Sequence, residues 1–527
     1  MNMKPTSAQQ AAIDCEGNAV VTACPGSGKT FTLVRMIARE SVDLLSFQGV
    51  IALSYTNKAS EELRKRCERI GVKKQKSFFG TVDSFCLSQI IIPFAPQIIN
   101  RPLNLKVAED NNFNYGQWKE LPEECRRDFI LKSFEVESIQ IDIIGAAALL
   151  VLEMVPQARI FIKARYTSIF IDEYQDCDYY QHQLMKTLMS YGLRSVAIGD
   201  IDQSIFQYNG SSPNYLRELI SSEKYEHFVI NENHRCDPSI QEYSRVLIGG
   251  THAKTIPERE RRVFAVHISG DEGDVSRTIE RFLPRIMKKY QVENRSSVAI
   301  IGCRNRTLER VSSALTLPHK RFADTTLKSF SRWQRILSGL LTEYYNPEHF
   351  SGDFLDNYLG INVKTTKRNQ GLALVDDFFG VREEDLVNQT DLAFAIADLC
   401  GPGLGCDEDI EAYCSTVKDV DILRRGFRPA QSDEINVLTY HKAKGLEFDI
   451  VFCLEAYRFI MPPYKGVQKD IEQSLGMHYV GITRAKKACY IALGSQRHNK
   501  DGLRDAEPSE FLTKNEALKG LRRDVHW

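Results

Sequence analysis

A glycine-rich segment near the N-terminus has the residue types that bind nucleotide phosphates. It reads Ala23-Cys24-Pro25-Gly26-Ser27-Gly28-Lys29-Thr30 and lies between an apolar run and a predicted helix. Glycines have no Cβ, so backbone N–H groups can approach the phosphates, and the start of the helix adds a partial positive charge. Lys29 would neutralise the β- and γ-phosphates, and the Thr30 hydroxyl would bind Mg²⁺. A glycine turn without function fits this context poorly.

Two adjacent acids, Asp172 and Glu173, complete the predicted site. They follow the apolar run 168–171, as expected where a buried strand reaches the edge of a sheet. Asp172 would hold Mg²⁺, directly or through water, and Glu173 would polarise the attacking water. Two carboxylates in an apolar site repel each other, and a bound cation compensates for that repulsion. A solvent-exposed acidic turn is the alternative interpretation, which the glycine-rich segment makes less favourable.

These residues need a scaffold of parallel strands, and the sequence has the pattern for one. Short apolar runs alternate with longer helical patterns, which is typical of an α/β fold with mostly parallel strands. The predicted strands cover 18–23, 50–53, 168–171, 195–199, 228–230, 298–302, 450–454 and 488–493. Because strand groups lie on both sides of the second half of the chain, we expect two α/β cores.

Two stretches break the alternation and are predicted to be mainly helical insertions. The chain then divides into core 1A (1–90 and 166–240), insertion 1B (91–165), core 2A (241–340 and 432–527) and a reduced insertion 2B (341–431). A length of 527 residues is enough for several such units.

Composition excludes several classes of protein. The 68 basic and 69 acidic residues give a net charge of −1, so a globally basic nucleic-acid-binding protein is excluded and any such contact must be local. The basic run 64–76 is one local candidate, although a solvated helix face is the simpler interpretation. The 13 cysteines form no recognisable metal pattern, which favours reduced thiols in a cytoplasmic protein. No apolar run is long enough for a membrane span, and the N-terminus lacks a signal-peptide core.

The segment Asp172-Glu173-Tyr174-Gln175-Asp176 resembles the D-E-x-Q-D box of superfamily 1A helicases of the UvrD/Rep type. Further segments follow the order of that family's boxes, at 6–10, 55–59, 80–85, 199–206, 233–235, 439–448 and 479–486. The resemblance implies two RecA-like P-loop NTPase cores that hold ATP, or another NTP, with Mg²⁺ between them. Each core would carry one of the helical insertions.

The resemblance also implies roles for residues outside the phosphate loop. Gln9 would read adenine, Gln203 would sense the γ-phosphate, and Glu447 would contact the ribose. Arg235 and Arg484 would be arginine fingers that neutralise the transferring phosphate. The residues implied to contact DNA are Tyr55, Thr56, Asn57, Thr81, Phe206, Tyr208, Thr439 and His441, the aromatic ones by stacking on bases. Core packing is the alternative for Phe206 and Tyr208.

Several departures from the family pattern concern DNA binding and its coupling to ATP. Asn209 stands where the coupling box usually has Arg, and Asp83 stands where the second DNA box usually has His. Met36 occupies the place of an Arg in the helix after the phosphate loop. Leu475 and Gly476 stand where arginines usually precede the last box. None of these departures removes an ATPase residue.

The compact insertions and the segments 80–94 and 164–178 are similar to those of GajB-type proteins, the UvrD-like components of the Gabija anti-phage system. This resemblance implies an NTPase or helicase that responds to single-stranded DNA or DNA ends. It also implies a partner, a GajA-like OLD-family endonuclease with a Toprim domain, in a hetero-oligomer without membrane attachment. A stand-alone 3′-to-5′ DNA repair helicase and a scaffold with an inert ATPase are the alternatives.

Overall fold

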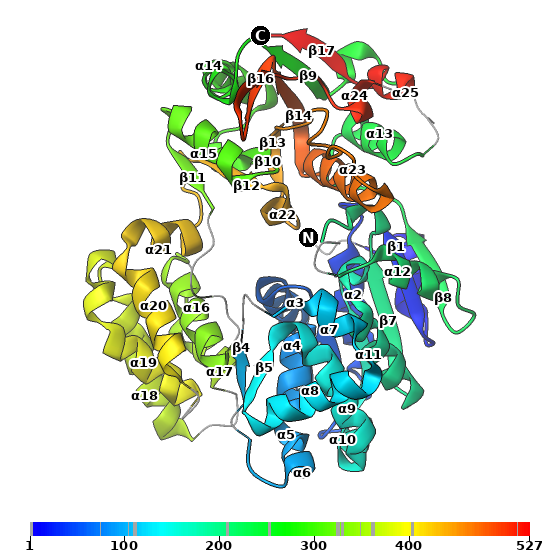
Figure 1. The fold of residues 1–527 in the computed structure, drawn as a ribbon, viewed down its shortest axis with the longest axis vertical. Coiled ribbons are helices and arrows are strands. Elements are labelled where there is room, and N and C mark those ends of the chain that lie inside the picture. Colours follow the sequence, from blue (N-terminus) through cyan, green and yellow to red (C-terminus); the bar gives the residue numbers. More distant parts are fainter. Residues whose placement is uncertain are drawn as a thin grey trace.

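The computed structural model contains two parallel sheets flanked by helices, together with two insertions (Figure 1). It describes residues 4–73, 75–103, 105–108, 113–206, 210–250, 255–322, 327, 331–347, 349–359, 364–401, 405–513 and 515–527. Parallel sheets covered by helices on both faces are the arrangement that the alternating pattern predicts. The predicted fold class is therefore confirmed.

The first sheet belongs to core 1A and has the strand order β3-β2-β6-β7-β1-β8, with every pairing parallel. Its strands are β1 (Ala19–Ala23), β2 (Gly49–Leu53), β3 (Phe78–Gly80), β6 (Tyr166–Ile171), β7 (Arg194–Gly199) and β8 (Glu226–Ile230). Because β6, β7 and β1 are neighbours, the segments that follow them lie at one edge of the sheet. This edge brings the phosphate loop close to the acids that follow β6.

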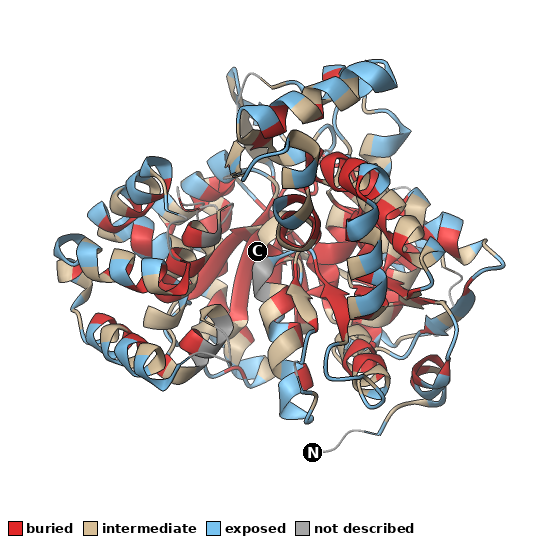
Figure 2. Cartoon of the chain, turned by 90° about the horizontal axis from the view of Figure 1, so that it is seen from below, coloured by how far each residue is buried: buried red, intermediate tan, exposed pale blue. Residues whose placement is uncertain are grey.

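Helices cover both faces of this sheet, which explains why β1 is apolar apart from Thr22. Val20 packs into one hydrophobic cluster and Val21 into another, on the opposite face. The covering helices are α1 (Ser7–Asp14), α2 (Lys29–Glu40), α3 (Asn57–Arg69), α11 (Tyr179–Ser190) and α12 (Pro213–Ile220). Figure 2 shows the buried strands between layers of helices that expose their outer faces.

The second sheet belongs to core 2A and has the order β11-β12-β10-β13-β14-β9-β17, again with every pairing parallel. Its strands are β9 (Val263–Ile268), β10 (Val298–Gly302), β11 (His319–Arg321), β12 (Ile435–Thr439), β13 (Phe448–Cys453), β14 (Ala485–Gly494) and β17 (Arg523–His526). Its helices are α13 (Pro238–Leu247), α14 (Glu272–Tyr290), α15 (Asn305–Ala314), α22 (Tyr440–Ala443) and α23 (Gln468–Thr483). A hairpin of β15 (Gln496–Asn499) and β16 (Gly502–Asp505) and the short helices α24 (Glu510–Thr513) and α25 (Glu516–Lys519) complete the core.

Insertion 1B is mainly helical, but two short parallel strands correct the prediction of a strand-free segment. These are β4 (Lys106–Ala108) and β5 (Ser138–Gln140). Strands of three residues are too short to give a recognisable apolar run. Helix α4 (Val82–Phe85) and the π-helical turn Cys86–Ile91 lead from core 1A into the insertion. The helices of the insertion are α5 (Ile92–Phe94), α6 (Pro96–Ile99), α7 (Tyr115–Glu120), α8 (Glu123–Glu135), α9 (Ile144–Met154) and α10 (Pro156–Arg165).

Insertion 2B is helical in the described residues and has a hydrophobic core of its own. Its helices are α16 (Arg332–Tyr344), α17 (Ser351–Tyr358), α18 (Thr365–Phe379), α19 (Thr390–Cys400), α20 (Asp407–Lys418) and α21 (Val420–Phe427). Trp333 and Ile336 of α16 pack in the same cluster as Leu355 and Val375. Helix α16 therefore packs with the insertion, although its first residues precede the predicted boundary at residue 341.

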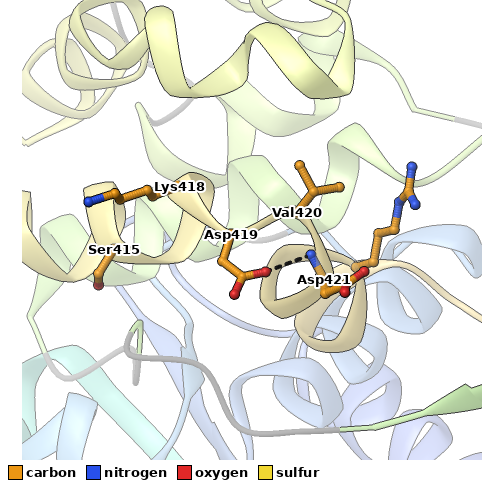
Figure 3. Close-up of a pocket in the computed structure, with 6 residues that line it drawn as sticks. Ser415, Lys418, Asp419, Val420 and Asp421 are labelled. Atoms are coloured by element: carbon orange, nitrogen blue, oxygen red, sulfur yellow. Dashed lines mark hydrogen bonds between the residues drawn. The ribbon is translucent and has the colours of Figure 1, made fainter.

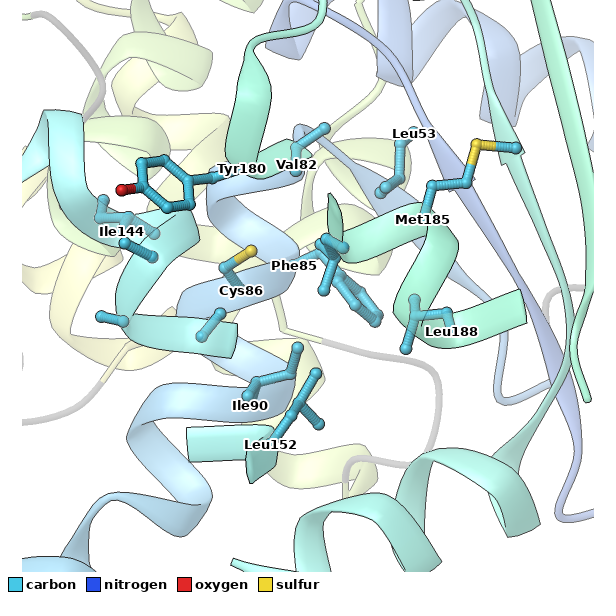
Figure 4. Close-up of a cluster of buried hydrophobic side chains, with 14 of the residues drawn as sticks. Leu53, Val82, Phe85, Cys86, Ile90, Ile144, Leu152, Tyr180, Met185 and Leu188 are labelled. Atoms are coloured by element: carbon cyan, nitrogen blue, oxygen red, sulfur yellow. The ribbon is translucent and has the colours of Figure 1, made fainter. Parts of the chain in front are cut away.

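The helical stretch Val82–Ile99 is long and apolar enough to cross a membrane by length and composition, and the bent pair Ile141–Met154 and Pro156–Arg165 passes the same test together. Inside the protein, Phe85 and Ile90 of this stretch pack against Leu152 and Leu188 (Figure 4). Packing in this core accounts for the apolar composition of the stretch.

Candidate nucleotide and DNA-binding site

The phosphate loop joins β1 to α2 at the carboxyl edge of the first sheet. Gly26 and Gly28 have φ values of 73° and 84°, which are strained for any residue with a Cβ. Gly28 is the N-cap residue of α2, so the unpaired N–H groups at the start of this helix lie in the loop. Gln9 lies directly beside the loop, since the Gln9 Nε2 donates a hydrogen bond of 2.8 Å to the carbonyl of Ser27. The loop thus has the shape and polarity to hold phosphate groups.

The remaining loop residues support this shape. Ala23 ends β1 and is buried, and the Ser27 hydroxyl donates a hydrogen bond of 2.7 Å to the carbonyl of Cys24. The backbone N–H of Cys24 donates to the carbonyl of Ile230 at the end of β8. Pro25 has no N–H of its own to satisfy within this turn. The loop is therefore held by its neighbours before any ligand binds.

Charged side chains meet where β1, β6 and β7 end. Lys29 Nζ lies 4.0 Å from Oδ2 of Asp200. Burial, together with the charge of Glu173, raises the pKa of Asp172 to about 7. Burial opposes the ionisation of Glu173, but Lys29 and Lys444 lower its pKa to about 2. The adjacent carboxylates therefore compete for charge, which is a situation that a divalent cation relieves.

The donors beside the loop fit the Mg²⁺ ion that the sequence predicts. A hydroxyl from Thr30 and a carboxylate from Asp172 are hard oxygen ligands, which Mg²⁺ prefers, with its remaining positions filled by water and phosphate. Burial and the charge of Glu173 raise the pKa of Asp172, and a cation bound at this place would offset both effects. Asp200 is not among the predicted site residues, although it follows an apolar strand just as Asp172 does.

A chain of polar contacts connects Lys29 with core 2A. Gln203 Nε2 donates a hydrogen bond of 2.6 Å to Oδ2 of Asp200, and Arg484 Nη2 donates one of 3.1 Å to Oε1 of Gln203. Arg484 is buried, and burial followed by repulsion from Arg235 lowers its pKa to about 10, so the guanidinium keeps its charge at neutral pH. Lys29, Asp200, Gln203 and Arg484 form one polar chain from the phosphate loop to the second core.

Arg235 approaches the phosphate loop from another side. A Cβ at Gly26 would lie 2.5 Å from Cβ of Arg235 and 2.7 Å from Oδ1 of Asn233. The guanidinium of Arg235 lies 2.5 Å from Oε1 of Glu447, whose other oxygen is 3.2 Å from Lys486 Nζ. The buried Nε of Arg235 has no hydrogen-bond partner in the described residues. An anionic group bound at the loop would provide one.

The two cores also touch beside the D-E-x-Q-D box. Lys444 donates to a carboxylate oxygen of Asp176 and, at 2.7 Å, to the carbonyl of Gln203. His441 Nε2 lies 3.1 Å from the carbonyl of Ile205. A Cβ at Gly476 would lie 3.1 Å from the carbonyl oxygen of Ser204, so the glycine that replaces a family arginine lets α23 approach this segment closely.

Aromatic and basic side chains gather at the same interface. The rings of Tyr55 and Phe206 stack with centroids 4.7 Å apart, and the ring of His441 lies 5.5 Å from that of Phe206. Lys444 Nζ lies 5.1 Å from the centroid of the Phe206 ring. A stacked pair beside a cation is suitable for binding bases of a single strand. Tyr208 and Asn209 lie outside the described residues.

The three predicted DNA-binding threonines share a local structure. Thr56, Thr81 and Thr439 are the N-cap residues of α3, α4 and α22, and each hydroxyl accepts a backbone hydrogen bond from its helix. Helix N-termini carry partial positive charge, so a DNA phosphate at these caps would be favoured. Asn57 is the first residue of α3, and its side chain lies outside what the structure describes.

Two departures from the family pattern have structural explanations. Burial, with the charges of Asp178 and Asp142, raises the pKa of Asp83 to about 7, so this acid interacts with other acids near insertion 1B. Met36 is fully buried in the core beneath α2, where no ligand can reach it. Arg35 lies instead over the ring of Phe31, with 3.6 Å between Cζ and the ring centroid.

Two family models match the chain, and they fall on the two cores. A model described as AAA domain matches residues 7–209, and one described as UvrD-like helicase C-terminal domain matches residues 423–496. The first match includes the phosphate loop, the acids after β6 and Gln203, and the second includes Glu447 and Arg484. In both cores the chain is similar to the UvrD-like helicases of superfamily 1.

Three individual proteins to which the chain is similar agree with the family models. The Gabija protein GajB of Bacillus cereus (strain VD045) is 24% identical over 497 residues, covering 92% of this chain and 94% of the relative. The ATP-dependent DNA helicase PcrA of Bacillus subtilis (strain 168) is 20% identical over 619 residues, covering 93% of this chain and 82% of the relative. The ATP-dependent DNA helicase Rep of Salmonella typhimurium is 22% identical and covers 66% of this chain and 63% of the relative.

Proposed function

We propose that this UvrD-like helicase is a DNA-stimulated, ATP-hydrolysing component of a Gabija-type anti-phage complex. The likeness to GajB extends over nearly the whole length of both chains. The alignment with PcrA needs 619 positions to cover a similar share of this chain, so it contains many more unmatched positions. The compact architecture therefore favours the GajB-type function over that of a long processive helicase.

The polar chain from Lys29 through Asp200 and Gln203 to Arg484 is the observation that supports ATP hydrolysis most strongly. Lys29 and the two arginines would bind the charge of the transferring phosphoryl group from opposite sides. Glu173, whose negative charge Lys29 and Lys444 stabilise, would orient the attacking water and accept a proton from it as the bond between the β- and γ-phosphates breaks. Mg²⁺, held by Thr30 and Asp172, would supply positive charge to the phosphate oxygens.

In this proposal nucleotide and DNA act on the same few residues. Gln203 bonds to Asp200 and Arg484, and the Gln203 carbonyl accepts from Lys444, whose Nζ lies by the Phe206 ring. A strand stacked at Tyr55 and Phe206 would therefore bias the closure of core 2A over the nucleotide. Single strands or DNA ends would raise turnover through this coupling.

Replacing Lys29 with Ala tests the proposal most directly. Hydrolysis should fall below detection with or without single-stranded DNA, because the phosphate loop loses its cation. Lys186→Ala is the matched control, since Lys186 lies on α11 of the same core, half exposed and paired with Glu218. Steady-state phosphate release by both variants gives the answer. Wild-type turnover by Lys29→Ala would contradict the proposed site, whereas full protection of cells by a variant that no longer hydrolyses ATP would favour the scaffold with an inert ATPase.

The finer part of the proposal concerns the partner. A GajA-like OLD-family endonuclease with a Toprim domain would form a hetero-oligomer with the chain, and nucleotide turnover would control or accompany its cleavage of DNA. Co-purification of the two proteins and native mass spectrometry test this. Efficient, processive unwinding of duplex DNA by the isolated chain, without a stable complex, would favour the stand-alone 3′-to-5′ repair helicase instead.

A further inference from the structure

Glu173, the predicted general base, is followed by a tyrosine whose side chain is bonded inside core 1A. Tyr174 is fully buried, and its hydroxyl lies 2.8 Å from Nδ1 of His182 on α11. His182 is fully buried as well, and its Nε2 lies 3.2 Å from Oε2 of Glu218 on α12. Polar groups from three segments therefore meet at the hydrophobic cluster that contains Tyr174.

The protonation state of His182 sets the direction of the hydrogen bond to Tyr174. Burial lowers the pKa of His182, although the charge of Glu218 opposes this shift, so the imidazole is neutral at neutral pH. A neutral imidazole carries one N–H, and the carboxylate beside Nε2 favours the proton on that nitrogen. Nδ1 is then an acceptor, and the Tyr174 hydroxyl donates to it. The ring of Tyr215 stacks on that of His182, with centroids 4.9 Å apart, and keeps it in this orientation.

Glu173 has a backbone conformation that its neighbours must support. Its φ of 53° lies in the left-handed region, which is costly for a residue with a Cβ. The N–H of Asp176 closes the turn by donating a hydrogen bond of 2.9 Å to the carbonyl of Glu173. Such a conformation persists only where surrounding contacts fix it. Because Tyr174 is the next residue, the bond made by its hydroxyl fixes the position of this turn.

Two residues of the D-E-x-Q-D box hold Glu173 from different directions. Gln175 Nε2 donates a hydrogen bond of 2.5 Å to Oε2 of Glu173, and Gln175 Oε1 accepts one of 2.9 Å from the N–H of Asp200, which follows β7. Gln175 thus connects the carboxylate to the end of β7. Tyr174 connects the backbone beside that carboxylate to α11. Both contacts restrict where the carboxylate can lie.

Packing alone does not require a hydroxyl and an imidazole at these two positions. Leu184 and Leu216 belong to the same cluster as Tyr174, so phenylalanine and leucine side chains would suit this core. Burying polar groups lowers stability unless they are hydrogen bonded, so the polar pair adds little stability beyond what apolar side chains would supply. A hydrogen bond differs from an apolar contact because it fixes a direction and a distance.

We propose that Tyr174 and His182 are positioning residues for Glu173 in ATP hydrolysis. The hydrogen bond between them fixes the turn so that the Glu173 carboxylate faces the attacking water. Glu173 alone would contact that water, and the other two residues act through it. This inference rests on the proposed ATP hydrolysis by the chain.

Four variants test the inference by steady-state hydrolysis of ATP with saturating single-stranded DNA. Tyr174→Phe keeps the packing of the ring and should lower kcat about tenfold with the KM for ATP within about twofold, because the phosphate loop is intact. His182→Leu should do the same. The two substitutions combined should be no slower than either alone, since both break one bond. His182→Asn should recover most of kcat, because its amide oxygen accepts in place of Nδ1.

Asp419→Ala is the matched control for stability. Asp419 caps α21 in insertion 2B, where it accepts a hydrogen bond of 2.9 Å from the N–H of Asp421 beside a surface hollow of about 660 Å³ (Figure 3). Its loss should lower the unfolding temperature by a few degrees, as in the Tyr174 and His182 variants, but should leave kcat unchanged. Lys186→Ala should also leave kcat unchanged, because the surface ion pair of Lys186 with Glu218 contributes little.

Glu173→Gln provides the background that separates positioning from a general disturbance of the core. This variant should lower kcat by about 10²-fold or more, and adding Tyr174→Phe to it should cause no further loss. A further tenfold loss would overturn the positioning role. Wild-type kcat in both Tyr174→Phe and His182→Leu would overturn it as well and leave the proposed function standing. A wild-type chain that hydrolyses no ATP would overturn both.

Discussion

The two cores share one architecture but use the helix after a central strand in opposite ways. In core 1A, β1 leads through Gly26 and Gly28 into α2, whose first N–H groups are left to a ligand. In core 2A, β10 leads into α15, and Glu455 fills the corresponding place. This carboxylate accepts hydrogen bonds from the N–H groups of Cys303 and Arg304, at 2.6 and 3.0 Å.

Glu455 is thus a built-in anion where core 1A has room for phosphate. It also accepts from the Thr307 hydroxyl at 2.7 Å and from Arg304 Nε at 2.6 Å, and it is 2% exposed. Core 2A instead contributes to the nucleotide site from the edge where its strands begin, since Glu447 directly precedes β13 and Arg484 directly precedes β14. One core therefore offers the phosphate cradle, and the other offers cations that reach it.

The nucleotide site between the cores is impaired most severely if Arg484 of core 2A is removed, or Arg235, which directly precedes Cys236 in the hydrophobic cluster of core 2A. Arg235→Ala and Arg484→Ala should each lower kcat by about 10³-fold, because an arginine finger acts on charge that develops in the transition state. Nucleotide affinity should change much less, since the phosphate loop stays intact. Steady-state kinetics and nucleotide titration separate the two effects. Equal losses of affinity and kcat would instead indicate a ground-state role.

The built-in anion should matter for stability rather than for catalysis. Glu455→Ala should lower the free energy of unfolding by about 3 kcal/mol, because it leaves buried donors at the start of α15 without an acceptor. Glu455→Gln keeps an acceptor oxygen and should cost about half as much. Denaturant titration measures both, and nucleotide titration of the folded variants provides the control. Weaker nucleotide binding in folded Glu455→Gln would contradict the comparison.

Much of this arrangement can be predicted from sequence because it depends on local pattern. The phosphate loop is contiguous, and the acids follow an apolar run, so composition and order suffice. Edge strands escape such reasoning, since β11 (His319–Arg321) and β17 (Arg523–His526) are short and charged. The role of Glu455 could not be predicted from the sequence for another reason. Its partners lie about 150 positions earlier, and only the pairing of β10 with β13 brings them together.

The smallest predicted effect concerns Asp172 of core 1A, which accepts a hydrogen bond of 3.0 Å from the N–H of Glu173 but lies beside the charge of the Glu173 carboxylate. The pKa of Asp172 is about 7 in the folded protein against 3.8 ordinarily, so the folded state binds the proton more tightly. The free energy of unfolding of the nucleotide-free protein should therefore fall as pH rises from about 4 to 7, at no more than about 1.4 kcal/mol per pH unit. Asp172→Asn should remove this slope and stabilise the nucleotide-free protein by about 2 kcal/mol at pH 8.

Thermal and denaturant unfolding at pH 5 and pH 8 measure that difference. Asp449→Asn is a suitable control, because Asp449 is a partly exposed acid of core 2A paired with Lys487 at 3.1 Å. Adding Mg²⁺ and nucleotide should abolish the advantage of Asp172→Asn, since the cation then compensates the carboxylate in the wild type. If the wild type were equally stable at both pH values without ligand, Asp172 would already be compensated within the protein. The contrast with Glu455 would then be wrong, and the cation would not be needed to balance this edge of core 1A.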